Sequence, residues 1–129
     1  MPLNAALPPV QPVCAELDIH RVLTLRLEGA VTAASLDTAI SEVTRVAHGA
    51  RVDAFLIDAR GTHIAYQMSH LTQAVEQIMD EIAPRRCAVL GTGERSEAFR
   101  AIESTARAYA MKACPFRCET EARAWLVQS

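Results

Sequence analysis

The apolar segment from Val52 to Asp58 constrains the fold of this chain more than any other feature. It stands between two stretches of helical periodicity and is followed at once by Ala59, Arg60 and Gly61. An apolar run of this length, bounded by turn residues, is typical of a strand that is covered on both faces. Such strands alternate with helices in a largely parallel sheet. The segment therefore predicts an α/β fold, but it does not indicate a reaction.

The remaining periodicity predicts two strands and a helix, followed by three strand–helix pairs. Alternating leucines after a polar step predict an antiparallel pair with a tight turn near residues 18–21. Thr32 or Ser35 can cap the first helix, and Gly49 can end it. Ser69 is expected near the start of the second helix, and Thr120 is expected to cap the fourth. The expected strands are 13–20, 22–27, 52–58, 86–90 and 116–118, and the expected helices contain Leu36–Ala47, Leu71–Ile82, Phe99–Ala110 and Ala122–Leu126, with Trp125 facing inward.

One domain is predicted for residues 13–129, preceded by a flexible arm at residues 1–12 that is rich in proline. The 129-residue chain is half hydrophobic and 22% charged, which is the composition of a globular domain. Its net charge of -2 and its scattered basic residues argue against nucleic acid or an anionic membrane as a partner. No signal peptide and no apolar run of membrane-spanning length is visible, so a cytoplasmic location is expected.

The cysteines do not predict a disulfide or a metal site. Cys14 and Cys87 fall in strand-like runs, where cysteine behaves as a small hydrophobic residue. Cys114 and Cys118 are four residues apart, which on a strand places them on one face at a separation of about 13 Å. A disulfide requires Cα atoms within about 7 Å, and the spacing is not the Cys-x-x-Cys of zinc or redox sites. Core or surface thiols are therefore favoured over a metal site at these cysteines. The predicted site contains no metal and no cofactor.

A binding site in an open α/β sheet lies outside the carboxyl ends of its parallel strands. Three segments are expected to meet there: 58–66, 91–96 and 28–32. The first of them opens the long connection from Arg60 to Met68, and long loops in compact domains tend to carry function. The predicted ligand-binding residues are Asp58, Arg60, Thr62, His63, Tyr66, Thr92 and Gly93.

Two of these features have competing interpretations. Gly91-Thr92-Gly93 leads from a strand to a helix N-terminus and could hold an anion, but a tight turn is favoured because Ser96 stands where a dinucleotide fingerprint has its third glycine. Asp58 and Arg60 could pair or bind a polar ligand. Equally, Asp58 could accept backbone N–H bonds in the turn while Arg60 is solvated.

The side chains of the long connection leave similar alternatives. His63 and His70 could share a metal, or His63 could act as a general base, but solvated histidines are favoured because no carboxylate ligand set accompanies them. Tyr66, Met68 and Met79 could line an apolar pocket, although ordinary core positions are favoured. No nucleophile elbow or paired-carboxylate motif is visible, which argues against an enzyme without excluding one.

Four features of the chain are found together in one known family: the order of elements, the segment Val22–Gly29, the buried strand ending in Asp58, and the tail from Phe116 to Leu126 with its Glu-Ala-x-x-Trp-Leu ending. Through them the chain resembles the SpoIIAA-like proteins of the STAS superfamily over residues 13–127. It implies a single α/β domain whose mixed, mostly parallel sheet of about five strands is backed by about four helices. Many members are small bacterial proteins of unassigned function.

The family also implies two kinds of activity. Sporulation-type members are switched by phosphorylation of a serine at the start of the second helix, in an Asp-Ser-Ser-Gly-like motif. Here the region from Ile64 to Ser69 lacks the acidic residue and the serine pair, and only Ser69 is nearby, where it could equally be an N-cap. Some STAS-like domains bind small apolar molecules or lipids, which would suit Tyr66 and Met68.

Three functional hypotheses follow. The first is a non-enzymatic module that binds a small apolar or lipid-like ligand or a protein partner, with pairing of two copies left open. The second is a phosphoswitch adaptor of the anti-anti-sigma type, modified at Ser69 by a kinase. The third is a small enzyme that uses Asp58, His63 and Tyr66, for which a strongly perturbed titration in a closed cleft would be evidence.

Overall fold

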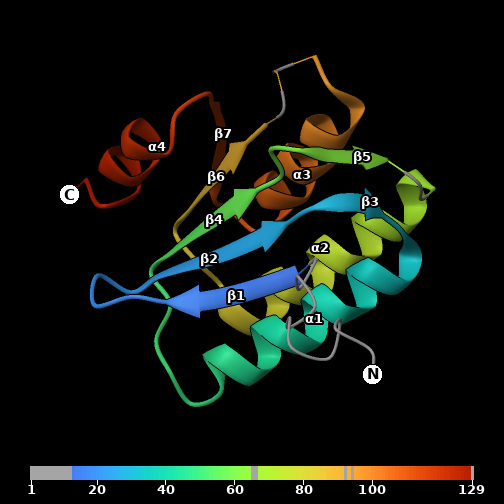
Figure 1. Ribbon diagram of the computed structural model, residues 1–129. Helices are drawn as coiled ribbons and strands as arrows, with labels where there is room; N and C mark the ends of the chain where they lie inside the picture. Colours follow the sequence, from blue (N-terminus) through green and yellow to red (C-terminus); the bar gives the residue numbers. More distant parts are fainter. Residues whose placement is uncertain (1–12, 65–66, 92, 94, 129) are drawn as a thin grey trace, which may run out of the picture.

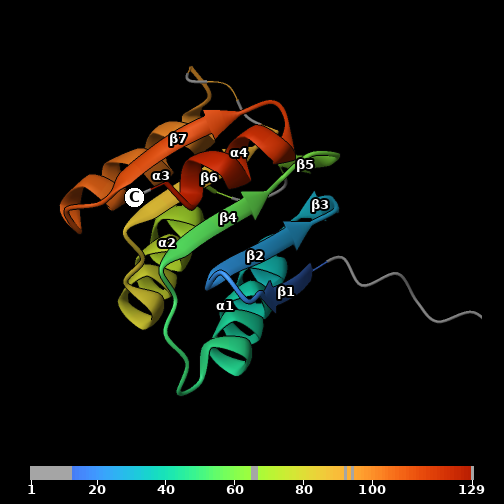
Figure 2. The same cartoon turned by 90° about the vertical axis from the view of Figure 1, so that its left-hand side faces the viewer.

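A five-stranded sheet separates three helices on one face from a single helix on the other (Figure 1, Figure 2). The computed structural model describes residues 13–64, 67–91, 93 and 95–128, so the expected arm at 1–12 lies outside the described residues. The strand order is β1-β2-β4-β6-β7, with β1 antiparallel to β2 and the other neighbours parallel. This arrangement confirms the expected α/β class and its mostly parallel sheet.

The elements follow one another along the chain as a strand pair, a short third strand, a helix and then strand–helix units. In order they are β1 (Val13–Leu17), β2 (Val22–Leu27), β3 (Gly29–Val31), α1 (Ala33–Ala47), β4 (Ala54–Asp58), β5 (Thr62–Ile64), α2 (Met68–Ile82), β6 (Arg86–Leu90), α3 (Glu97–Ala108), β7 (Lys112–Phe116) and α4 (Glu119–Leu126).

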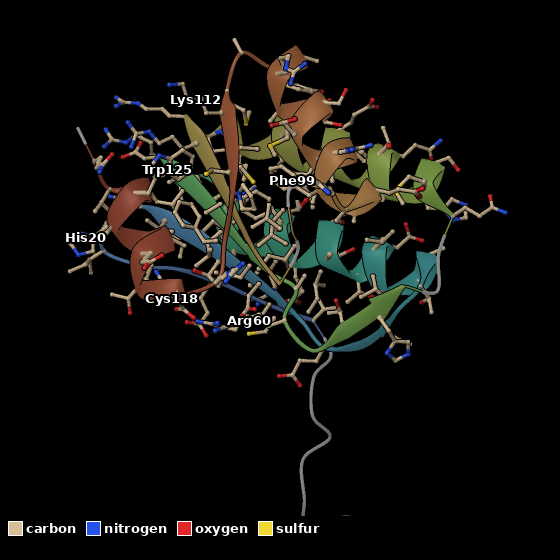
Figure 3. All side chains as sticks on the ribbon, turned by 90° about the horizontal axis from the view of Figure 1, so that it is seen from above. His20, Arg60, Phe99, Lys112, Cys118 and Trp125 are labelled. Carbon is tan, nitrogen blue, oxygen red and sulfur yellow. The ribbon has the colours of Figure 1, made fainter. Side chains whose placement is uncertain are left out.

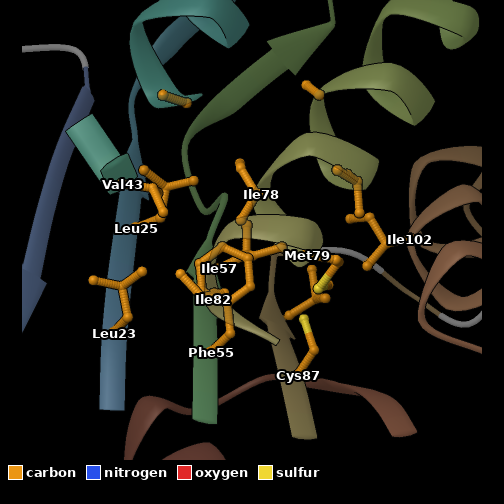
Figure 4. Packing of buried hydrophobic residues seen from close by; sticks show 14 of the residues in the cluster. Leu23, Leu25, Val43, Phe55, Ile57, Ile78, Met79, Ile82, Cys87 and Ile102 are labelled. Atoms are coloured by element: carbon orange, nitrogen blue, oxygen red, sulfur yellow. The ribbon is translucent and has the colours of Figure 1, made fainter. Parts of the chain in front are cut away.

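Strand β4 is covered on both faces, as its apolar run predicts. All five of its residues are buried. Phe55 and Ile57 pack in the large core against α1, α2 and α3 (Figure 4), whereas Ala54 and Leu56 belong to a smaller core beneath α4. The alternation follows from the two-residue period of a strand, which sends neighbouring side chains to opposite faces. The same alternation decides on which face each functional residue lies.

Several predicted turns and caps are confirmed. Asp18 accepts hydrogen bonds from the backbone N–H groups of His20 and Val22, which fixes the turn between β1 and β2. Thr32 caps α1 and shares a reciprocal capping box with Ser35 at 3.1 and 3.2 Å. Gly49, just after α1, has a φ of 69°, a conformation that favours glycine.

The long connection at 60–68 is not free of regular structure. Its residues Thr62–Ile64 form β5, which pairs in parallel with β3 at Gly29–Val31. Each strand has only three residues, too few for alternation to reveal, and the glycines at 29 and 61 indicate turns instead. The short pair β3–β5 extends beyond the end of the main sheet, over α1 and α2 (Figure 1).

The ends of several other elements differ from the prediction. Strand β1 ends at Leu17 rather than at residue 20, and β4 begins at Ala54 rather than at Val52. The last strand, β7, is Lys112–Phe116 rather than 116–118. Pro115 argues against a strand at this position, because proline cannot donate a backbone hydrogen bond. Proline is tolerated in β7 because that strand lies at the edge of the sheet. As a result, Cys118 is the N-cap residue of α4 in place of Thr120, and it does not share a strand face with Cys114. Helix α2 begins at Met68 after Gln67, so Ser69 lies inside its first turn and is not the cap.

The apolar stripe predicted for the third helix extends beyond the C-terminal end of the observed helix. Phe99, Ile102 and Ala106 are buried as expected, but α3 ends at Ala108. Tyr109 is exposed and donates a hydrogen bond from its hydroxyl group to the Asp80 carboxylate at 2.7 Å. Ala110 has a φ of 58°, which takes the chain out of the helix. Both residues fit a helical period, so periodicity alone does not reveal where the helix stops.

Candidate functional site

The carboxyl ends of β2, β4 and β6 carry two chemically different sites on opposite faces of the sheet. On the face covered by α4 lies a charged cluster formed by Arg26, Asp58, Arg60, Glu119 and Arg123. On the face covered by α1, α2 and α3 lies an apolar pocket. The split follows from strand alternation, because Asp58 and Ile57 are neighbours whose side chains point to opposite faces.

Asp58 is the most buried member of the charged cluster. Arg26, which lies opposite Asp58 in the parallel register of β2 and β4, donates to its Oδ2 at 2.7 Å. Arg60 donates from Nε and Nη2 at 2.9 Å each, and its backbone N–H reaches Oδ1 at 3.2 Å. These bonds, from the Arg60 side chain above all, hold the pKa of Asp58 below its usual value.

Glu119, the first residue of α4, completes the charged cluster. Arg26 binds both of its carboxylate oxygens at 3.0 Å, Arg60 binds one at 3.2 Å and Arg123 binds the other at 2.8 Å. The bonds from Arg26 and Arg123 lower the pKa of Glu119 to about 2. Arg123 also donates to Asp18 and Thr24. The cluster therefore fastens α4 to the sheet and to the turn between β1 and β2.

The charged cluster has little acceptor capacity left for a ligand. Each of the four carboxylate oxygens of Asp58 and Glu119 already accepts two hydrogen bonds from protein donors. A lowered pKa also makes Asp58 a poor general base near neutral pH. Asp58 and Arg60 form the predicted pair, and Asp58 also accepts the predicted backbone N–H bond. The alternative that Arg60 is merely solvated is wrong, because its guanidinium binds both Asp58 and Glu119. The geometry therefore favours a structural role in docking α4 over a catalytic one.

The apolar pocket has a volume of about 270 Å³ and lies between the sheet and the three helices. Leu25, Ile57 and Val89 of the sheet face Val75 of α2 and Ile102 of α3 across it. Val31 of β3 and Thr62 of β5 extend its wall past the end of the main sheet. Its walls are thus the same stripes that the sequence assigns to the core.

The loops after β4 and β6 meet at this pocket, as the sequence predicts. Gly91 has a φ of 94°, and a Cβ atom at this position would stand 2.6 Å from the backbone nitrogen of Arg60. The N–H of Ala59 donates to the carbonyl of Leu90 at 2.9 Å. Only a residue without a side chain lets the two backbones approach so closely. Gly91, Gly93 and Ala59 all line the pocket.

The predicted ligand-binding residues therefore do not form one site. Thr62 and Gly93 line the apolar pocket, while Asp58 and Arg60 belong to the charged cluster on the other face. His63 is exposed on β5. Tyr66 and Thr92 lie outside the described residues, so their predicted roles stay predictions.

Other proposed contributors lie elsewhere. Met79 is fully buried in the core and Met68 packs at its margin; neither is among the described residues that line the pocket. His70 is exposed on α2. Within the described part of the chain, no group of three or more His, Cys, Asp or Glu is arranged to hold a metal ion. None of the described helices is long and apolar enough to cross a membrane.

Three members of the charged cluster are not among the site residues predicted from the sequence: Arg26, Glu119 and Arg123. Arg26 carried a signal, because it is the one charged residue in the apolar run of β2. Such a charge on a covered strand requires a partner on the same face. The position of Glu119 could not be inferred in the same way. Glu119 is 93 residues from Arg26 in the sequence, and the two side chains meet because α4 packs on this face of the sheet.

Comparisons with known proteins identify the fold. No protein-family model and no curated protein matches the sequence. A crystal structure of a DUF3478 family protein from Shewanella loihica PV-4, described as having a SpoIIAA-like fold, superimposes with a TM-score of 0.64 at 15% identity, over 92% of this chain and 97% of that one. This chain has a SpoIIAA-like fold.

Two further structures with the SpoIIAA-like fold are of SpoIIAA, and the first of them is described as the Bacillus cell fate determinant. Its phosphorylated form matches with a TM-score of 0.61 and 13% identity, over 88% of this chain and 98% of that one. The unphosphorylated form, described as an anti-sigma factor antagonist, matches with a TM-score of 0.56 and 12% identity, over 89% and 96%. At these identities the comparison establishes the shared fold alone.

Proposed function

We propose that this SpoIIAA-like chain is a non-enzymatic binding module that takes a small apolar or lipid-like ligand into the apolar pocket. The observation that carries the proposal is the pocket itself, a space of about 270 Å³ at the carboxyl edge of a parallel sheet. Native cores are close-packed, with few voids larger than a water molecule. An apolar space of this size at the usual ligand-binding edge of an α/β sheet is therefore better explained by a ligand than by loose packing.

The volume and lining of the pocket limit the size and the polarity of the ligand. An engineered cavity of about 150 Å³ holds a benzene ring, so the larger space suits a molecule of about two rings or an alkyl chain of about eight carbons. No charged side chain is among the described residues that line it. Among the described residues, the polar lining consists of Thr62, Ser96 and the backbone of Gly91 and Gly93. A neutral polar end, such as a hydroxyl group, would therefore be accommodated more readily than a charge.

Filling the pocket should abolish binding without unfolding the protein. We expect 1-octanol, but not 1-butanol, to raise the melting temperature of the wild-type protein, because a ligand that binds only the folded state stabilises it. Ala98→Leu places a larger apolar side chain at the pocket wall and is expected to remove this shift. Its own melting temperature should stay close to that of the wild type, because the added carbons enter empty space.

The matched control for this experiment is Ala124→Leu, the same change at an exposed position of α4. It should leave the octanol-dependent shift intact. If octanol stabilises Ala98→Leu as much as it stabilises the wild type, the ligand does not occupy this pocket. If octanol gives no shift in the wild-type protein, the proposal of an apolar alcohol-sized ligand is wrong.

A second candidate function is the phosphoswitch at Ser69. It is favoured by the position of Ser69, which is exposed in the first turn of α2. A phosphate group there would be stabilised by the positive end of the helix dipole. Mass spectrometry of the protein purified from its native cells tests the proposal directly. Phosphate on Ser69 would support it, and an unmodified Ser69 under all growth conditions would count against it.

A further inference from the structure

A second cleft lies at the amino-terminal edge of the sheet, at the opposite end of the parallel strands from the apolar pocket. It has a volume of about 320 Å³. The turn between β1 and β2 contributes His20, the amino end of β6 contributes Arg85 and Arg86, and the end of α4 contributes Leu126 and Val127. Figure 3 shows His20 beside α4. None of these residues belongs to the charged cluster or to the apolar pocket.

Positive charge at this cleft is not neutralised by the described part of the protein. The Arg85 guanidinium and the His20 imidazole have no hydrogen-bond or ion-pair partner among the described residues. Asp53, the one carboxylate among the described residues that line the cleft, is already bound by Arg51 at 3.0 Å through both oxygens. Arginines in the charged cluster, in contrast, are all paired with carboxylates.

Arg86 is held in place but keeps unused donors. Its guanidinium lies 5.3 Å from the centre of the Trp125 ring, and Nη1 donates to the Trp125 carbonyl at 2.5 Å. These contacts fix the planar group at the wall of the cleft, while Nε and Nη2 have no partner among the described residues. A positioned guanidinium binds an oxyanion with less loss of side-chain entropy than a free one.

We infer that this cleft binds a small organic anion, a phosphate monoester or a carboxylate with an apolar body. The anionic group would meet Arg85 and Arg86, since guanidinium groups match the geometry of phosphate and carboxylate oxygens. The apolar body would lie against Leu126 and Val127; Val127 is 52% exposed and gains from being covered. The site is independent of the ligand proposed for the apolar pocket.

Titration of the isotopically labelled protein with phenyl phosphate and with benzoate, followed by NMR, tests the inference. Saturable shifts of the backbone amide signals of His20, Arg86 and Val127, with either compound, are expected. Shifts elsewhere but not at these residues would overturn the inference, and so would the absence of saturation with both compounds. Inorganic phosphate should bind more weakly than phenyl phosphate, because it cannot cover the apolar wall; equal affinity would contradict an organic ligand.

Two arginine variants make the test specific. Arg85→Ala removes an exposed guanidinium that no described residue binds, so the variant should fold normally. Binding should weaken about tenfold through loss of a charged hydrogen bond. Arg100→Ala, at another exposed arginine without a partner among the described residues, is the matched control and should bind like the wild type. Unchanged binding in Arg85→Ala, or an equal loss in Arg100→Ala, would overturn the inference.

Discussion

Replacing Gly91 with alanine is expected to lower the free energy of unfolding by about 3–5 kcal/mol, more than a surface substitution can. The added Cβ would stand 2.6 Å from the nitrogen of Arg60 and 2.7 Å from the carbonyl carbon of Ala59, both of them backbone atoms. The loop after β4 would have to move. Its movement would disturb the bond from Ala59 to Leu90 and the wall of the apolar pocket. Equilibrium unfolding in urea measures the loss.

Gly29→Ala is the matched control for this prediction. Gly29 also has a positive φ, of 72°, but no atom lies within 4 Å of a Cβ built there. Alanine at this position carries only the strain of the left-handed conformation, about 1–2 kcal/mol. Similar losses in the two variants would show that backbone strain, and not the close approach of the two loops, makes Gly91 necessary.

Glu119→Gln is expected to destabilise the protein by about 2 kcal/mol at neutral pH, a value reduced because the cluster is partly exposed to solvent. The change preserves shape but leaves Arg26, Arg60 and Arg123 without the charge that holds them together at the start of α4. Glu103→Gln is the control, because the only ion pair of Glu103 within the described part of the chain is with Arg107 on the exposed surface of α3. That variant should lose less than about 0.5 kcal/mol.

The effect of Glu119 should depend on pH in a defined direction. The pKa of Glu119 is lowered from 4.5 to about 2 in the folded protein, so the folded state favours the ionised form. Its contribution is therefore fully present above about pH 4.5 and is lost as the pH falls toward 2. The difference in unfolding free energy between the wild type and Glu119→Gln should shrink over this range. A difference that stays constant down to pH 2 would show that the carboxylate charge is not responsible.

The sequence predicts the large elements well because each is specified locally. The buried strand is recognised from the apolar run between Val52 and Asp58, and α1 and α2 are recognised from their apolar stripes. Helices that cover a sheet need such a stripe on the face that packs against it. Prediction fails where tertiary context decides. β3 and β5 are too short to show alternation, and Pro115 is acceptable in β7 only because that strand lies at the edge.

The candidate sites divide in the same way. That the loops after β4 and β6 meet follows from the rule for parallel sheets, and Gly91 shows how closely they approach. The face on which each side chain lies depends on the exact register of β4, which places Asp58 toward α4 and Ile57 toward the pocket. The apolar pocket could not be distinguished from the core, because its walls are made of the same buried residues.

The measurement that tests the proposed function most directly is the detection of intermolecular nuclear Overhauser effects between 1-octanol and the methyl groups of protein labelled at isoleucine, leucine and valine. The apolar pocket predicts contacts to Ile57, Val75 and Val89, and none to Leu56 or Leu90 in the core beneath α4. Contacts confined to Leu56, Leu90 or the exposed Ile19, or no contact at a saturating concentration of octanol, would contradict the account.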